Sequence, residues 1–383
     1  MRICVVGPVP PPAGGMANLT ADIVERLRTE GAQVELVAVN APYRPQWAGH
    51  IKGVRALFRL LPYLWHLFRS IRNADVVHLM ANSGWSWHLY AAPAIWLAHF
   101  LRTPLILNYH GGHAETFFNH SWRWIQPSMH RVNRIIVPSR FLQQLFADYN
   151  LDSAVIHNCI DTELFSPPAT RTPFSNAPRI LISRNLEPIY GIDLAIGALP
   201  QILQRFANAR LIIAGSGPQL PQLQQQIKQL GIDAHVEFTG RLSRQQIAER
   251  YRSCHLLINP SRVDNAPISI TEALACGLPV VSSRAGGIPL LVEDGKQALL
   301  VEVESSPALA EGVLRLLTDP PLMQQLTQQG LEHAQRFRWQ LIRSQLLGSY
   351  QHAISQPKAL KHPNSEQLTL KNACTPQTQD KQP

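Results

Sequence analysis

Charged residues are scarce in this chain of 383 residues: Asp, Glu, Lys and Arg together make up 16% of it. An average soluble domain contains roughly 25%. Apolar residues nevertheless make up 45% of the chain. That content and length are enough for about two domains with full-sized hydrophobic cores. The composition therefore excludes both wholesale disorder and a small protein that depends on crosslinks for its stability.

Disulfide and metal-binding patterns are also missing. The cysteines are odd in number and form no C-x-x-C pair or metal-ligand spacing; they are Cys4, Cys159, Cys254, Cys276 and Cys374. Free thiols of this kind are typical of a reducing compartment, so we expect a cytoplasmic protein.

Long hydrophobic runs are absent as well. The first apolar run, residues 3–6, is too short for the core of a signal peptide and is expected to be a buried strand. The longest apolar stretch, residues 85–101, is interrupted by histidines and a proline and falls short of the ~20 residues that a bilayer span requires. We therefore expect no transmembrane helix.

The net charge is positive, +9 at pH 7, and no long block of like charge accounts for it. A general excess of this kind suits anionic membrane surfaces, phosphate-bearing substrates or nucleic acid. No recognisable nucleic-acid-binding module and no interleaving of basic and aromatic residues accompany it, so we expect no nucleic-acid partner.

Short apolar runs alternate with helix-length segments along the chain. They lie at residues 3–6, 34–39, 76–79, 105–108 and 135–137, and then at 180–183, 211–214, 235–238, 256–259, 279–282 and 299–303. Alternation of this kind predicts parallel sheets covered by helices on both faces. We therefore predict an α/β protein with two doubly wound domains in tandem.

The boundary between the two domains is predicted at residues 164–178, where proline and small polar residues crowd together and no hydrophobic period survives. We assign the first domain to residues 1–165 and the second to residues 166–355. Residues 356–383 are polar and nearly free of aromatic side chains, which predicts a disordered tail.

Two features of the first domain favour a ligand site. Gly14 and Gly15 precede an amphipathic helix, where free amides and the positive end of the helix dipole favour an anion. The loop is neither a G-x-G-x-x-G fingerprint nor a Walker A loop, and a tight strand-to-helix turn explains it equally well. His110 directly follows an apolar strand, where open α/β sheets bind ligands. A histidine there can also be structural, but the two adjacent glycines favour a functional role.

The most specific feature of the second domain is an acid-x7-acid pair, Asp264 and Glu272. Pro267 suits the first position of a helix between them. The first free amides of that helix would belong to Ile268 and Ser269, and Glu272 would lie more than one turn inside it. Helix amides bind phosphate and a carboxylate accepts hydrogen bonds from sugar hydroxyls, so the combination suits a nucleotide sugar.

Arg184 lies upstream of this pair, at the end of a predicted strand. Arginine is the residue expected to bind a diphosphate through two hydrogen bonds. A single Arg or Glu is more often a solvated surface charge, but the ordered set of charged residues and glycines argues against that interpretation.

In order and spacing, these residues resemble family 4 of the retaining glycosyltransferases, which have the GT-B fold of two Rossmann-like domains facing a central cleft. The resemblance covers roughly residues 1–350. It is carried by the early Gly-Gly loop, DVVH at 75–78, His110-Gly111, VPS at 137–139, IHNCID at 156–161, SRNLEPIYG at 183–191, GSGP at 215–218, FTG at 238–240 and the acid pair.

The resemblance implies glycosyl transfer from a UDP- or GDP-type sugar, with retention at the anomeric carbon. It implies that Gly15 binds the donor phosphate through its amide, that His110 contacts the transferred sugar and that Arg184 binds the diphosphate. Asp264 would hold sugar hydroxyls and Glu272 the ribose hydroxyls. The predicted catalytic residues are His110, Asp264 and Arg184, and the predicted donor site comprises Gly14, Gly15, Arg184, Asn185, Tyr190, Ile268, Ser269 and Glu272. Neither a metal nor a cofactor is implied, and the sequence has no D-x-D motif.

Three residues depart from the family pattern. Tyr190 stands where the family usually has a lysine next to the phosphates, Asp264 where glutamate is commoner, and Cys159 where the interdomain turn usually has glycine. Losing one charge-assisted contact would cost ~2 to 4 kcal/mol of transition-state stabilisation. Another base such as Arg262 would then replace the lysine, or the donor would be handled differently, or activity would be low. The alternative function, motivated by Tyr190, is a non-catalytic nucleotide-sugar-binding or scaffolding subunit of a glycan assembly system.

Residues 51–72 carry an apolar stripe at helical spacing together with five basic residues and no acid; the stripe comprises positions 51, 54, 57, 58, 61, 64, 65 and 68. Pro62 is expected to split or kink this helix. A basic amphipathic helix with aromatic side chains suits an anionic membrane surface, here the inner face of the cytoplasmic membrane, and would fit a lipid-linked or glycan acceptor. A helix that packs its apolar face on the sheet and solvates its arginines explains the pattern equally well.

Overall fold

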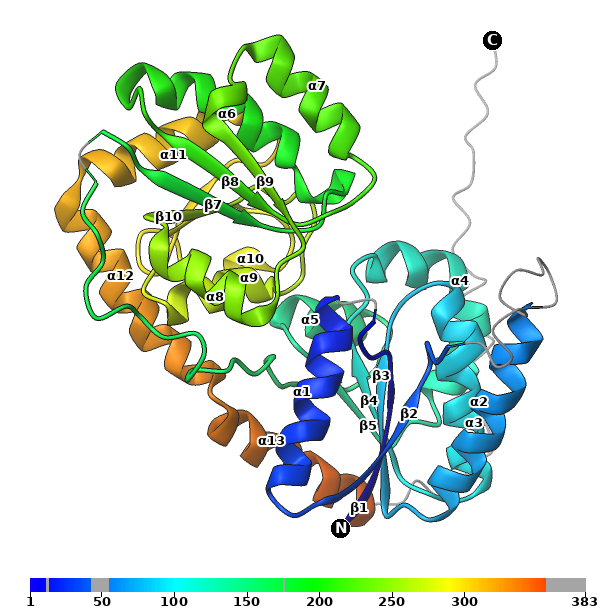
Figure 1. Cartoon of the computed structure of the whole chain (residues 1–383). Helices are drawn as coiled ribbons and strands as arrows, with labels where there is room; N and C mark the ends of the chain where they lie inside the picture. The colour runs from blue at the N-terminus through cyan, green and yellow to red at the C-terminus, as the bar shows by residue number, and fades with distance from the viewer. Residues whose placement is uncertain (12–13, 43–54, 175, 356–383) are drawn as a thin grey trace, which may run out of the picture.

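The computed structural model describes residues 1–11, 14–42, 55–174 and 176–355. Two parallel six-stranded sheets, each covered by helices on both faces, form two lobes (Figure 1). Every apolar run predicted to be a strand forms one. The predicted α/β class with two doubly wound domains is therefore confirmed. The predicted tail, residues 356–383, lies outside the described residues.

The first sheet has the strand order β2-β1-β3-β4-β5-β6. Its strands are β1 (Arg2–Gly7), β2 (Gln33–Ala38), β3 (Val76–Ala81), β4 (Leu105–Tyr109), β5 (Arg134–Val137) and β6 (Ala154–Val155). Its helices are α1 (Gly15–Thr29), α2 (Arg55–Arg72), the π-helix η2 (Trp87–Ala91), α3 (Ala92–Phe100), α4 (Ala114–Met129) and α5 (Arg140–Asp148). The very short strand β6 was not expected.

The second sheet has the order β12-β11-β10-β7-β8-β9. Its strands are β7 (Arg179–Ser183), β8 (Arg210–Ala214), β9 (Val236–Gly240), β10 (Leu256–Asn259), β11 (Val280–Ser283) and β12 (Leu299–Val301). The helices that follow are η3 (Pro188–Tyr190), α6 (Ile192–Arg205), α7 (Leu220–Leu230), η4 (Asp233–His235), α8 (Arg244–Ser253), α9 (Ile268–Ala275), α10 (Ile288–Leu291), α11 (Ser306–Thr318), α12 (Pro320–Ala334), η5 (Gln335–Phe337) and α13 (Trp339–Ser355).

Strand residues alternate between two cores, as a sheet covered on both faces requires. In β1, Cys4 and Val6 pack with the α2 to α5 layer, whereas Ile3 and Val5 pack with α1 and α13. The C-terminal helix α13 thus leaves the second lobe and returns to the first (Figure 1). The domain boundary at residue 165 stays a prediction. Helix α13 belongs to the range assigned to the second domain, 166–355, but packs in the core of the first sheet.

The predicted basic helix forms as α2, which begins at Arg55; residues 51–54 lie outside the described residues. Pro62 does not split it, and both Tyr63, directly after the proline, and Leu67, one turn later, are buried in the core. The apolar stripe predicted from the sequence includes Leu61, Trp65 and Phe68, whose exposed fractions are 62%, 65% and 41%. The interpretation that this stripe packs on the sheet is therefore wrong for these three residues.

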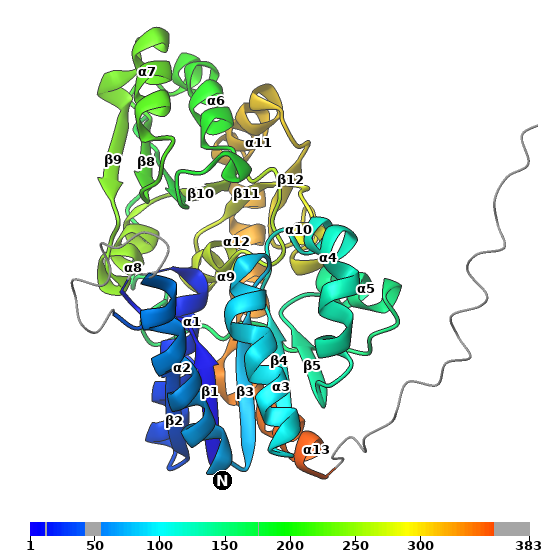
Figure 2. The same cartoon turned by 90° about the vertical axis from the view of Figure 1, so that its right-hand side faces the viewer.

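Strand order reverses beside β1 in the first sheet and beside β7 in the second. Ligands of open α/β sheets bind at such points, outside the carboxyl ends of the strands. The carboxyl ends of the two sheets face each other across the domain boundary, because residues that follow β1, β3, β4, β7 and β10 all line one cleft. Figure 2 shows the lobes stacked with α1 and α4 of the first below the loops of the second.

Candidate active site

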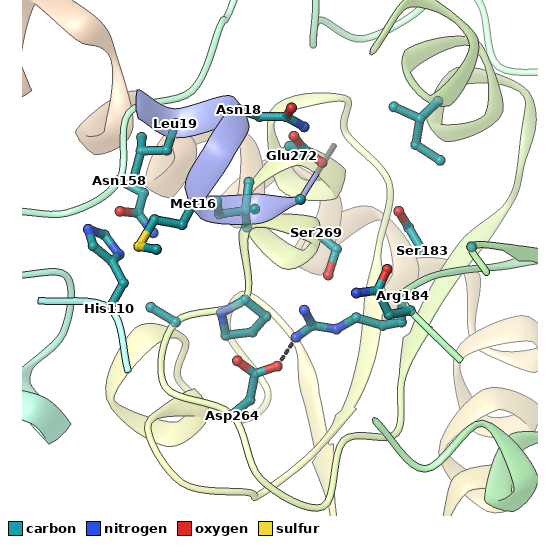
Figure 3. A pocket seen from close by; sticks show the side chains of 18 of the residues that line it. Met16, Asn18, Leu19, His110, Asn158, Ser183, Arg184, Asp264, Ser269 and Glu272 are labelled. Atoms are coloured by element: carbon teal, nitrogen blue, oxygen red, sulfur yellow. Dashed lines mark ion pairs between the residues drawn. The ribbon is translucent and has the colours of Figure 1, made fainter. Parts of the chain in front are cut away.

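A cleft of about 490 Å³ lies between the two domains. It brings together every residue predicted for the site: Gly14, Gly15, His110, Arg184, Asn185, Tyr190, Asp264, Ile268, Ser269 and Glu272. In Figure 3, His110 lies with Met16 and Asn158 on one side of the pocket, and Arg184 lies on the other. The sequence prediction of their shared location therefore agrees with the geometry, while their roles stay predictions.

Arg184 directly follows β7 and is held by several neighbours. Its Nε donates to Asn259 Oδ1 at 2.9 Å, and its guanidinium forms an ion pair with Asp264 (Figure 3). The ring of Tyr190 lies 4.8 Å from the guanidinium carbon, in a cation–π arrangement. Burial lowers the pKa of Arg184, but an arginine remains charged at neutral pH. The site thus contains a fixed buried cation beside a carboxylate.

Arg262 does not replace the lysine that Tyr190 displaces. Its guanidinium binds both carboxylate oxygens of Asp193 at 2.7 and 2.8 Å and also pairs with Glu304. Arg262 is not among the described residues that line the cleft. The expectation that Arg262 could serve the diphosphate is therefore wrong, because its guanidinium binds Asp193 and Glu304 and does not line the cleft, unlike that of Arg184.

Helix α9 begins at Ile268, one residue later than predicted, because Pro267 has an extended ψ of 112° and occupies the N-cap position. The first amides of a helix have no acceptor within it. Ser269 Oγ, also in this first turn, is buried and has no hydrogen-bond partner among the described residues. The start of α9 therefore presents several hydrogen-bond donors at the cleft.

Glu272 lies one turn further along α9, and the Tyr251 hydroxyl donates to its Oε2 at 3.1 Å. Burial raises the pKa of Glu272 to about 7, against the favourable effects of Tyr251 and Arg244. The carboxylate is consequently poised between its two protonation states at neutral pH.

His110 follows β4, and its backbone amide donates to Ala81 at 2.9 Å. Its ring atom Nε2 is buried and has no hydrogen-bond partner in the described part of the chain. Burial lowers the pKa of His110 to about 4, so the imidazole is neutral at pH 7. The free nitrogen of a neutral imidazole can donate a hydrogen bond to an uncharged polar group of a ligand, or accept one from it, depending on the tautomer.

Several site residues were not found by sequence reasoning. Arg244 on α8 pairs with Asp22 on α1 across the domain boundary, and Asn265 reaches Gly111 of the first domain. Asn259 was identifiable only by its place at the end of a strand. The cross-domain partners gave no local signal, since they meet only after the two domains dock.

No group of three or more His, Cys, Asp or Glu residues that could hold a metal ion occurs among the described residues. The prediction of a reaction without metal or cofactor remains a prediction.

Family models match both halves of the chain. "Glycosyltransferase Family 4" matches residues 13–164, and "Glycosyl transferases group 1" matches residues 169–333. The fold resembles that of Anabaena Alr3699/HepE in complex with UDP, with a TM-score of 0.71, 21% identity, and coverage of 92% of this chain and 100% of that one.

Among curated relatives, the GDP-mannose-dependent alpha-(1-6)-phosphatidylinositol monomannoside mannosyltransferase of Mycolicibacterium smegmatis is 31% identical, over 48% of this chain and 52% of the relative. The phosphatidyl-myo-inositol mannosyltransferase of Mycobacterium tuberculosis is 25% identical, over 88% of this chain and 93% of the relative. The chain thus spans about half the length of the first relative and most of the second.

Proposed function

The chain belongs to family 4 of the glycosyltransferases, with the GT-B fold, and from that premise we propose that it transfers a sugar from a nucleoside-diphosphate sugar to a glycan or lipid-linked acceptor, with retention at the anomeric carbon. The observation that carries the proposal is the convergence of Arg184, the start of α9 and Glu272 in one cleft at the carboxyl ends of both sheets. This arrangement offers the Arg184 cation, free helix amides and a carboxylate to a single ligand.

In the proposed reaction, Arg184 and the first amides of α9 bind the diphosphate and stabilise the negative charge that develops as it leaves. The amide of Gly15 binds phosphate from the opposite domain. Glu272 accepts hydrogen bonds from the ribose, and Asp264 holds hydroxyls of the transferred sugar beside the neutral ring of His110. Because fixed positive charge is supplied by the protein, we propose that no metal is required.

The names of similar proteins support a UDP- or GDP-type donor without choosing between them. One relative is named for GDP-mannose, and structures of Anabaena Alr3699/HepE are described in complex with UDP and with UDP-glucose. A donor panel that contains both nucleotide types is therefore needed.

We further propose that the first domain contacts an anionic membrane through α2, which would place a lipid-linked or cell-envelope acceptor near the cleft. Leu61, Trp65 and Phe68 form an exposed apolar stripe, and the Arg69 guanidinium carbon lies 5.8 Å from the centre of the Trp65 ring. Aromatic side chains flanked by arginine suit the boundary between head groups and acyl chains. Within the described residues, no helix combines the length and apolar composition needed to cross a membrane.

The test is a donor screen on the purified chain that follows release of UDP or GDP from nucleotide sugars, with and without membrane extract. Glu272→Ala should abolish donor binding. Arg184→Lys keeps a charge beside Asp264 but loses the paired donors, and should lower kcat/KM by about 100-fold. The matched controls Glu311→Ala and Arg210→Lys alter exposed residues outside the cleft. They should leave donor affinity and kcat/KM unchanged.

Unchanged donor affinity of Glu272→Ala would contradict the donor site. Binding without turnover, even with extract present, would favour the alternative of a nucleotide-sugar-binding scaffold, for which Tyr190 in the place of the family lysine is the motivating feature. Release of nucleotide from one donor would instead establish a transferase and identify its sugar.

A further inference from the structure

Asn265 of the second domain reaches across the cleft to the first domain. It directly follows Asp264 in the loop between β10 and α9, and only 8% of its surface is exposed. Its Nδ2 donates a hydrogen bond of 2.6 Å to the carbonyl oxygen of Gly111, the residue after His110. The contact therefore joins the two domains beside two residues predicted to meet the transferred sugar.

The backbone is closely constrained at both ends of this hydrogen bond. A Cβ at Gly111 would collide with Ser83 Oγ and with the Tyr109 hydroxyl. A Cβ at Gly287 would collide with the carbonyl oxygen of Asn265, and the Gly287 amide donates to the Asp264 carbonyl at 2.8 Å. Glycine permits these close approaches, so the chain is tightly packed around both Gly111 and Asn265.

The orientation of the Asn265 amide is fixed by its partner. A backbone carbonyl can only accept, so the group that faces Gly111 must be the NH2 group. The carboxamide oxygen Oδ1 is consequently the free end, and it is buried with no hydrogen-bond partner among the residues that the structure describes. Asn265 lines the cleft together with His110 and Ser269, whose Nε2 and Oγ atoms are also buried and, within the same described residues, unpartnered. A buried acceptor without a donor is unfavourable unless a ligand supplies one.

We propose that Asn265 is a positioning and specificity-determining residue: its NH2 group clamps the first domain at Gly111, and its Oδ1 accepts a hydrogen bond from a hydroxyl of the transferred sugar. The inference rests on the proposed glycosyl transfer. An amide oxygen repels phosphate and attracts a hydroxyl, which excludes the diphosphate at this position. Because Asn265 adjoins Asp264 and contacts the residue after His110, the hydroxyl is assigned to the transferred sugar and not to the ribose. Asn265 thereby links sugar recognition to the arrangement of the two domains.

Two variants separate these tasks from a purely structural role. Asn265→Ala removes both the donor and the acceptor. Asn265→Asp keeps the shape and an acceptor in the cleft but places a carboxylate oxygen against the Gly111 carbonyl, so the clamp is lost. Asn208→Ala changes an exposed asparagine of the second domain and serves as the matched control.

The clamp is tested on the free protein by amide hydrogen exchange. Exchange in the segment that contains residues 110–113 should accelerate about tenfold in Asn265→Ala and in Asn265→Asp, and stay unchanged in Asn208→Ala. Unchanged exchange in either folded Asn265 variant would overturn the clamp. Because the Asp variant preserves side-chain volume, failure of the Ala variant to fold would leave this test intact.

The acceptor is tested by calorimetric titration of UDP-glucose against UDP and of GDP-mannose against GDP. Asn265→Ala should weaken binding of the nucleotide sugar about tenfold and change affinity for the matching nucleoside diphosphate by less than about twofold. Equal weakening of both ligands, or of neither, would overturn the acceptor role while the proposed function stands. If the unaltered chain bound neither ligand type, the proposed function would fail together with the acceptor role, and hydrogen exchange would still decide the clamp.

Discussion

The proposed function requires Glu272 to be charged, whereas its buried surroundings favour the neutral form. Burial raises its pKa from 4.5 to about 7 in the folded chain. Between these two values the folded state binds more protons than the unfolded state, so the free energy of unfolding falls as the pH rises from 4.5 through 7. This loss is the energetic cost of keeping a hydroxyl-binding carboxylate in a closed cleft.

Glu272→Gln should therefore stabilise the chain above pH 7 while it impairs donor binding. The neutral amide avoids a penalty of about 3 kcal/mol at pH 8, whereas below pH 4.5 the variant and the unaltered chain should be equally stable. Urea unfolding of both proteins at pH 5 and at pH 8 measures the difference. A stability gap that is the same at both values would refute the raised pKa, and Glu311→Gln on the exposed face of α11 should show no gap.

A site residue could be predicted from the sequence where its expected role follows from its own position at the end of a strand or within a helix. Arg184 and His110 each follow a strand, and Glu272 lies within a helix that begins at the cleft. Arg244 and Asn265 were not predictable, because their partners belong to the other domain and no local pattern encodes how two domains dock. Arg262 was misjudged for the same reason: its neutralising partners, Asp193 and Glu304, are remote in sequence.

At the scale of elements, hydrophobic periodicity located every strand of both sheets except β6, since a run of β-branched residues buried on two faces has few alternatives. The same reasoning found α2 but not which of its faces is buried. Tyr63, Leu67 and Ile71 pack inward, whereas Leu61, Trp65 and Phe68 of the predicted stripe are solvent-exposed. When a helix is apolar on two sides, tertiary packing determines which side is buried.

The exposed stripe of α2 gives a prediction at this scale. Trp65→Ala combined with Phe68→Ala should weaken binding to phosphatidylglycerol vesicles at least about tenfold, because two aromatic anchors are lost from the apolar face. Stability should change by less than about 0.5 kcal/mol, since neither side chain is in the core. Vesicle sedimentation measures the binding, and Leu230→Ala, an exposed apolar residue of α7, is the control. Equal sedimentation of the double variant and the unaltered chain would contradict membrane contact through α2.

At the scale of the whole molecule, the two domains are joined by more than the covalent linker. The Ile160 amide donates to the Phe337 carbonyl at 2.8 Å, so the two segments that pass between the domains pair with each other. Arg244 bridges α8 to Asp22 of α1. Helix α13 continues from the second lobe and completes the core of the first, where the Tyr350 hydroxyl hydrogen-bonds His78 Nδ1 at 2.7 Å. These connections predict that the domains unfold together.

Trp339 is the residue at which this coupling is best tested. It begins α13, is 6% exposed in the core of the first sheet, and donates from Nε1 to Glu30 Oε1 at 2.7 Å. Trp339→Ala should destabilise the docking of α13 by ~3 to 5 kcal/mol, because a large buried ring is replaced by a cavity. Calorimetry should then resolve two unfolding transitions in place of one, with the first domain melting earlier. Trp339→Phe keeps most of the packing and should retain a single transition, as should Leu341→Ala on the exposed side of the same helix. A single transition in Trp339→Ala, merely shifted to lower temperature, would show that α13 is not what couples the domains.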